Sequence, residues 1–162
     1  MVVQLAAMDL HFGQAGLLEP YVPEPDSLVH SFDVTFRNPS WLAAAETLFE
    51  AWLDAGEVVS ARASLERFAA KNRQWSSFLS RGVEDLLFSR LLVAEDTSVQ
   101  MAVAATGRAL ESFRHAKAPW WIAKGIRLLD SLAQAPSHLI GEAADIEQRL
   151  ELRETGANPA EA

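Results

Sequence analysis

The chain has 162 residues, no cysteine, and a formal net charge of −8 from 14 Lys and Arg against 22 Asp and Glu. The length favours one domain with a single core, and the lack of cysteine excludes a disulfide framework, a thiolate zinc site and a catalytic thiol. Because phosphate groups are bound by clustered Lys and Arg, the acidic balance argues against nucleic acid or an anionic membrane as the main partner.

The first 38 residues are predicted to form a helix followed by a connector. Apolar residues on one face favour a helix over residues 2–18. Three prolines predict an extended connector over residues 19–26. Residues 31–36 alternate with period two in β-favouring residues and carry the one strand-like pattern.

Targeting signals are weak in this sequence. The first eight residues hold no Lys or Arg, so they lack the basic region of a secretory signal. No apolar run approaches the roughly 20 residues needed to span a bilayer. We therefore expect a soluble, cytoplasmic protein without a membrane partner.

Helix signals dominate the rest of the chain, where apolar residues recur at spacings of three and four. Gly56 and Asn72 fit helix ends, and Thr97 or Ser98 and Ser137 fit helix starts. Phe78 lies on a predicted apolar stripe. The tail after residue 154 is expected to be disordered. The predicted helices span residues 40–54, 58–71, 75–94, 99–116, 118–132 and 138–153.

Helices of this length joined by short turns are antiparallel neighbours, either in an irregular bundle or in a stack of hairpins. A shift of 45 residues places residues 65–68 (Leu-Glu-Arg-Phe) on residues 110–113 (Leu-Glu-Ser-Phe), and Trp75 on Trp120. Internal similarity at a fixed spacing is typical of helical repeats. This match favours the stack of hairpins.

Residues 53–68, with Gly56 at the turn and Ala61 as the small residue where two helices touch, resemble a tetratricopeptide (TPR) hairpin. Residues 109–129 are similar to the degenerate repeats that follow the ATPase module in bacterial LuxR/MalT-type transcription regulators and cyclase-linked ATPases. The sequence has no Gly-x-x-x-x-Gly-Lys-Ser/Thr loop, so that ATPase module is missing here. The resemblance covers about residues 40–150.

The resemblance implies an all-α fold of antiparallel helical hairpins, stacked as a short TPR-like right-handed α-solenoid. The expected domains are an N-terminal helix with its proline-rich connector over residues 1–38, the repeat domain over residues 39–154 and the tail over residues 155–162. It also implies a protein-binding module of a bacterial signal transduction or transcription regulator.

Residues suited to catalysis or metal binding form no recognisable pattern. His11, His30, His115 and His138 show neither His-x-x-x-His nor Glu-x-x-His spacing, so we interpret them as surface or turn residues. The carboxylate pair at residues 84–85 is expected on a solvated helix face with ion pairs along the helix, and the pair at residues 95–96 at a helix start. There is no Gly-x-Ser-x-Gly motif. We predict no catalytic residues, no metal and no cofactor.

Tryptophans and nearby cations mark the candidate binding surface. Adjacent helical residues diverge by about 100°, so Trp120 and Trp121 cannot easily enter one core. Either one is core and the other covers the preceding turn, or one lines a groove that binds a peptide or small ligand. The candidate partner-binding residues are Trp75, Arg114, Lys117, Trp120, Trp121 and Lys124.

The sequence thus predicts a non-catalytic protein-interaction or regulatory module that binds a protein or peptide. The alternative is a small helical bundle that binds a ligand, or acts as an enzyme, with its site between helices. A third hypothesis is a homodimer formed through an open end of the repeat stack, because terminal repeats leave apolar faces uncovered.

Overall fold

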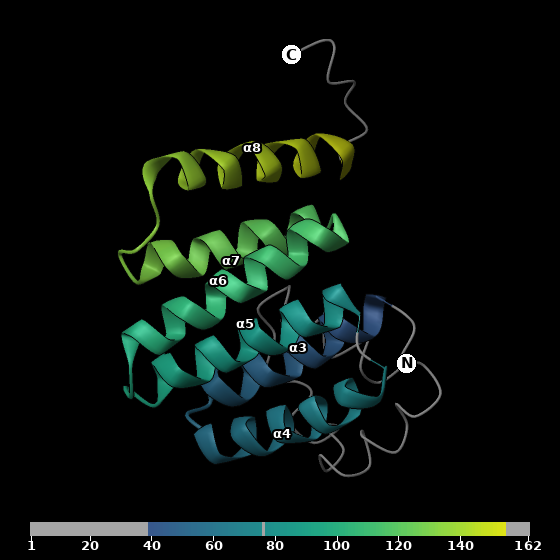
Figure 1. The fold of residues 1–162 in the computed structure, drawn as a ribbon, viewed down its shortest axis with the longest axis vertical. Coiled ribbons are helices and arrows are strands. Elements are labelled where there is room, and N and C mark those ends of the chain that lie inside the picture. The colour runs from purple at the N-terminus through teal and green to yellow at the C-terminus, as the bar shows by residue number, and fades with distance from the viewer. Residues whose placement is uncertain (1–38, 76, 155–162) are drawn as a thin grey trace. The chain divides into compact units, whose positions relative to one another are not determined.

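The structure is a computed structural model that describes residues 39–75 and 77–154 (Figure 1). The N-terminal helix, connector and strand-like segment predicted within residues 1–38 lie outside the described residues, as does the tail predicted over residues 155–162. The described residues form helices and turns and contain no strand, which confirms the all-α prediction for this part of the chain.

The chain divides into two compact units, Met1–Trp75 and Ser76–Ala162, and each is described by itself. The first contains α3 and α4, and the second contains α5 to α8. The helices within the described residues are α3 (Pro39–Asp54), α4 (Val58–Trp75), α5 (Phe78–Ala94), α6 (Val99–Ala116), α7 (Pro119–Ser131) and α8 (Ser137–Glu154).

The end of α4 and the start of α5 differ from the sequence prediction. Asn72, predicted to end a helix, is only 1% exposed, and α4 continues past it to Trp75. The next helix begins at Phe78 because Ser77 caps it. The Ser77 hydroxyl accepts a hydrogen bond from the Ser80 amide at 3.1 Å, and the Ser80 hydroxyl accepts one from the Ser77 amide at 2.9 Å. This reciprocal capping box stabilises the start of α5 three residues later than predicted.

Two other predicted helix starts lie within one residue of the observed ones. Ser98 is the N-cap of α6, where its side chain accepts a hydrogen bond from the Met101 amide at 3.3 Å. Ser137 was predicted as a cap but is the first residue of α8. The carbonyl of Pro136 accepts hydrogen bonds from the amides of Leu139 and Ile140 in the first turn of that helix.

Four helices end in the same backbone turn. A residue one or two positions after each helix end has a positive φ, +75° at Gly56 and 51°, 52° and 55° at Asp96, Lys117 and Ala133. Its amide bonds to the carbonyl three residues back, and the following amide bonds to the carbonyl five residues back. This is the Schellman motif, which satisfies the last carbonyls of a helix. It confirms Gly56 as a stop, while three of the four turns use a residue other than glycine.

Unit Met1–Trp75 contains a helical hairpin in which α3 packs against α4. Ala61, the expected small contact residue, is fully buried. Burial of apolar side chains is the main favourable term in such packing. The buried apolar residues described in this unit are Leu42, Phe49, Ala61, Leu65 and Phe68.

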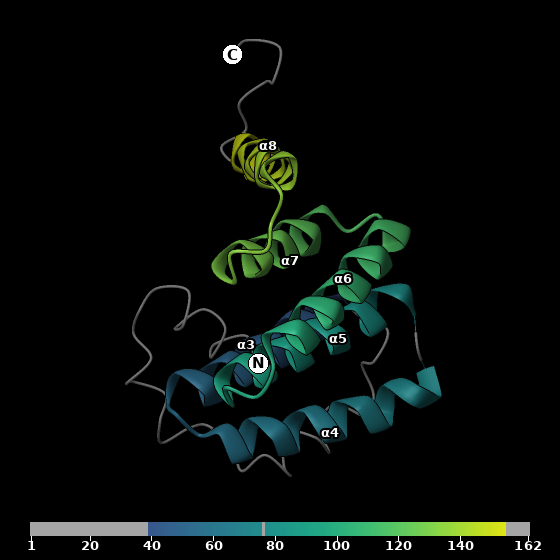
Figure 2. The ribbon, with the colours of Figure 1, turned by 60° about the vertical axis from the view of Figure 1, so that its left-hand side comes forward.

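In unit Ser76–Ala162, α5 packs most extensively on α6, α6 packs on α7 and α7 packs on α8 (Figures 1 and 2). Two glycines permit close helix contacts. A Cβ at Gly82 would lie 2.5 Å from the Phe113 ring, and one at Gly125 would lie 2.8 Å from Leu110. The core shared by α6, α7 and α8 contains Leu110, Ala123, Ile126, Leu129, Ala143 and Ile146.

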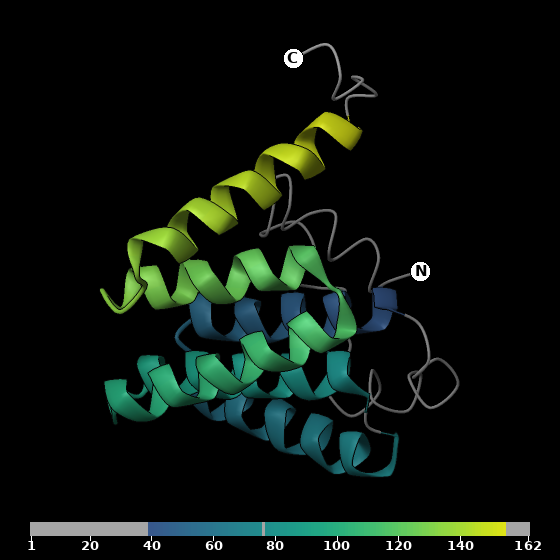
Figure 3. The ribbon, with the colours of Figure 1, turned by 45° about the horizontal axis from the view of Figure 1, so that its top comes forward.

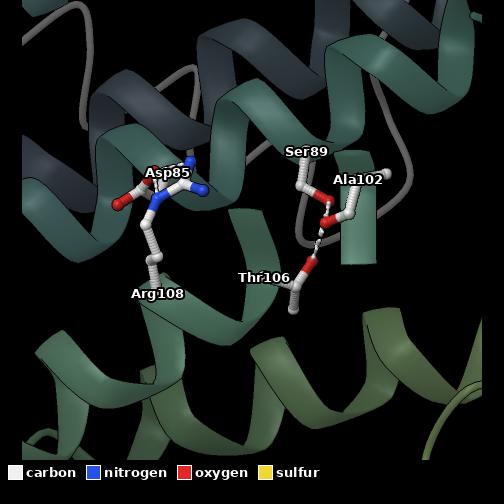
Figure 4. Close-up of polar contacts among 5 residues, drawn as sticks. All are labelled: Asp85, Ser89, Ala102, Thr106 and Arg108. Atoms are coloured by element: carbon white, nitrogen blue, oxygen red, sulfur yellow. Dashed lines mark hydrogen bonds and ion pairs between the residues drawn. The ribbon is translucent and has the colours of Figure 1, made fainter. Parts of the chain in front are cut away.

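Polar contacts join α5 to α6 at two places (Figure 4). In the buried one, the hydroxyls of Ser89 and Thr106 lie 2.7 Å apart, and both reach the carbonyl of Ala102, at 2.8 and 3.0 Å. In the exposed one, the Arg108 guanidinium donates twice to one Asp85 oxygen, at 3.0 and 2.6 Å. Asp85 therefore bridges two helices, whereas the sequence prediction placed its ion pairs within one.

Candidate functional site

The predicted site residues fall into two groups. Trp75 is the last residue of α4, in unit Met1–Trp75. The other five belong to unit Ser76–Ala162, where the end of α6 and the start of α7 lie beside the start of α5 (Figure 3). They are Arg114, Lys117, Trp120, Trp121 and Lys124.

The two adjacent tryptophans point into different surroundings. Trp121 is only 6% exposed, and its ring stacks on Phe113 of α6 with centroids 5.6 Å apart and an interplanar angle of 28°. Trp120 is 50% exposed. The expected divergence along the helix is therefore confirmed. Trp121 therefore belongs to the core and offers little surface to a partner.

Lys124 links both tryptophans one helical turn further along α7. Its ammonium lies 5.1 Å from the centroid of the Trp120 ring and 5.6 Å from that of Trp121. Residues three and four apart are neighbours on a helix, and a cation over an indole face is attracted by the ring quadrupole. This contact restrains the exposed Trp120 ring and places positive charge beside it.

The surrounding segment is unusually poor in negative charge. Residues 112–129 contain no Asp or Glu in a chain that has 22 of them. Two of the cations in this segment are nevertheless neutralised by α8. Arg114 contacts Glu142 at 2.8 Å, and Arg127 donates to both oxygens of Glu147 at 2.9 and 2.5 Å.

The Arg127–Glu147 pair shifts the pKa values of both side chains. Its hydrogen bonds lower the pKa of the Glu147 carboxyl and raise the pKa of the Arg127 guanidinium. Asp130 lies 3.9 Å from Arg127 and raises that pKa further. Both side chains are substantially exposed, so water screens the attraction. The pair joins α7 to α8 and contributes modestly to stability.

Lys117 is different from these arginines. It is exposed, lies in the left-handed turn between α6 and α7, and forms no ion pair with any residue that the structure describes. The helix that follows begins at Pro119, has no acidic residue in its first turn and has no side-chain cap. No carboxylate among the described residues pairs with Lys117 beside the exposed Trp120.

A second exposed aromatic cluster was not predicted from the sequence. Phe78, expected to face the core, is 48% exposed because it is the first residue of α5. Its ring stacks on His115 with centroids 5.0 Å apart, and the Arg81 guanidinium lies 4.8 Å from its centroid. The signal that identifies it is the capping Ser77, which places Phe78 in the first helical turn.

A shallow hollow lies on the exposed face of α6. Its volume is about 350 Å³, and its lining includes Gly107, Glu111, Arg114 and His115. These side chains carry both signs of charge, so the hollow does not select an ion of one sign. It is a surface feature beside the candidate site.

Residues 39–75 and 77–154 contain no cluster of metal ligands and no helix that could cross a membrane. In this part of the chain, no three His, Asp or Glu side chains come close enough to hold a metal ion. His115 stacks on Phe78, His138 is exposed, and His11 and His30 lie outside the described residues. None of the described helices combines the length and apolar character needed to cross a bilayer.

Comparisons with protein-family models, with curated proteins and with solved structures found no match to this chain. The candidate site is therefore defined by its own geometry. It consists of Lys117, Trp120 and Lys124 at the turn from α6 to α7, which we call the α6–α7 corner.

Proposed function

We propose that this protein is a non-catalytic protein-interaction module that binds a protein or peptide through the α6–α7 corner. The observation that carries the proposal is the half-exposed Trp120, restrained by Lys124 and adjacent to the buried Trp121. Exposed tryptophans on rigid elements are frequent hot spots of protein interfaces, because a large ring is buried there at little cost in conformational entropy.

The proposal includes a TPR-like right-handed stack of hairpins. Its support is that the extensive contacts among α5 to α8 join helices that are consecutive in the chain, with glycines at two close contacts. Antiparallel neighbours joined by short turns are the units of such solenoids. With the resemblance of residues 53–68 and 109–129, this favours a role in a bacterial signalling or transcription regulator.

A photo-crosslinking experiment tests the binding surface. Trp120 is replaced by benzoylphenylalanine in one sample and the exposed Ser131, at the other end of α7, in a control sample. After irradiation in an extract of cells that naturally express the chain, we expect a discrete adduct from position 120 alone. An excess of unlabelled wild-type protein should suppress the adduct, whereas Trp120→Ala should not.

Equal labelling from positions 120 and 131 would contradict the proposal. So would suppression by Trp120→Ala as strong as by the wild type. Circular dichroism of each variant checks that the helices are retained, so that loss of the adduct reports on the surface and not on unfolding.

A further inference from the structure

We infer that the partner bound at the α6–α7 corner is an acidic peptide segment with an apolar or aromatic anchor residue. The inference rests on the proposed function and adds the chemistry of the partner to it. In this arrangement the anchor side chain covers the exposed face of Trp120, and a carboxylate of the peptide pairs with Lys117.

The charge distribution favours a carboxylate. Arg114 and Arg127 already pair with Glu142 and Glu147 of α8, so they are neutralised within the unit. Lys117 has no such pair among the described residues, and the segment 112–129 around it contains no acidic residue. A positive corner on a chain of net charge −8 steers an acidic segment to one place and repels it elsewhere.

The ring of Trp120 supplies the apolar half of the contact. It is 50% exposed, and Lys124 is held over it at 5.1 Å. An aromatic or aliphatic side chain placed on the ring would bury its exposed part and lower the local dielectric. A nearby charge pair is stronger in that environment than in water.

A peptide fits this surface better than a nucleic acid does. Phosphate backbones are bound by several cations acting together, and the affinity grows with their number. Here two of the local cations are neutralised by α8. A single carboxylate beside one apolar anchor matches what the corner offers.

The test uses a fluorescein-labelled library of nine-residue peptides, each with four Glu residues around one variable apolar or aromatic position. A second library carries Gln in place of Glu. Fluorescence anisotropy on the full chain should show binding of acidic members with aromatic anchors, at least about tenfold tighter than their Gln counterparts, and weaker binding at high salt.

Substitutions at two positions of the corner separate binding from folding. Lys117→Gly removes the cation, yet it should raise the melting temperature, because glycine adopts the left-handed turn without strain. We expect it to weaken binding about tenfold, while Lys117→Arg retains it. Trp120→Ala should weaken binding roughly thirtyfold. The control Arg73→Gln, an exposed cation near the end of α4, should leave binding unchanged.

Acidic and Gln peptides that bind equally, or a Lys117→Gly variant that binds like the wild type, would overturn the inference. Tighter binding of a fifteen-nucleotide oligothymidylate than of any acidic peptide would also overturn it. If a position-120 adduct forms with a partner whose capture is insensitive to Lys117→Gly and to salt, the proposed function stands and only the acidic chemistry fails.

Discussion

Gly82 of α5 lies directly against Phe113 of α6, so close that a Cβ at position 82 would come within 2.5 Å of the ring and 3.2 Å of the Ala109 carbonyl. Phe113 is fully buried, and its ring also stacks on Trp121. The ring therefore has little room to move. The closeness of α5 and α6 depends on the absence of a side chain at this position.

We predict that Gly82→Ala destabilises the protein by about 1–3 kcal/mol through overpacking. The matched control is Gly107→Ala. That glycine is an exposed residue within α6 whose added Cβ meets nothing within 4 Å, so the change should stabilise by roughly 0.5–1 kcal/mol. Urea denaturation measures both. A Gly82→Ala variant as stable as the wild type would show that the helices separate easily.

The tryptophans should differ sharply in their contribution to stability. Trp121→Ala removes a buried ring from its stack on Phe113 and should cost roughly 3–5 kcal/mol. Trp120→Ala removes a half-exposed ring and a cation–π contact, so we expect a loss of about 1 kcal/mol or less. Thermal melts followed by circular dichroism distinguish them. Equal losses would mean that Trp120 is also a core residue.

Glu147 should make the stability of the protein sensitive to acid. Because its pKa is lowered in the folded state by the hydrogen bonds from Arg127, its contribution is complete above the ordinary glutamate value of 4.5. That contribution disappears as the pH falls through the lowered pKa. We expect Glu147→Gln to melt earlier than the wild type near neutral pH, with a difference that shrinks on acidification.

The control for this titration is Asp145→Asn, on the same helix. Its side chain is exposed and appears in no ion pair among the described residues, so its melting temperature should follow that of the wild type more closely. Parallel wild-type and Glu147→Gln curves at every pH would contradict the assigned role of the Arg127–Glu147 pair.

The turn after α7 offers a stabilising substitution. Ala133 has a φ of 55°, a conformation that costs an L-residue roughly 1–2 kcal/mol and that glycine adopts freely. We expect Ala133→Gly to stabilise the protein by a few tenths to about 1 kcal/mol. The same change at the exposed Ala144, inside α8, should destabilise by about 1 kcal/mol. Differential scanning calorimetry of both variants tests whether each change raises or lowers the melting temperature.

Most of the helical pattern could be predicted from the sequence, because the 3.6-residue period of apolar residues is a local property. The end of α4 and the start of α5 could not be predicted. Asn72 is buried within α4 although asparagine often ends a helix, and the reciprocal Ser77–Ser80 cap starts α5 later than the apolar pattern around Trp75 indicates. Phe78 fits an apolar stripe, yet the structure exposes it at the first turn.

The repeat seen in the sequence is only partly a structural repeat. Leu65 and Phe68 match Leu110 and Phe113 in being buried on a helix. Trp75, however, lies at the end of a helix, whereas its counterpart Trp120 lies in the first turn of one. The left-handed turn at residue 117 interrupts the second copy of the repeat.

The candidate site, too, could be predicted only in part from the sequence. The cluster of cations near the two tryptophans is visible in the sequence, but their neutralisation is not. Arg114 and Arg127 find partners 28 and 20 residues away on α8. Only the packing of α8 shows that the two arginines form ion pairs, whereas Lys117 forms none among the described residues.

The order of packing in unit Ser76–Ala162 bears on how quickly it forms. Its extensive helix contacts join elements that follow one another along the chain, α5 with α6, α6 with α7 and α7 with α8. Each contact therefore closes only a short loop, and chains rich in such local contacts reach the native state in microseconds to milliseconds. Refolding of this unit should be fast, and it should expose its apolar surfaces to other chains only briefly.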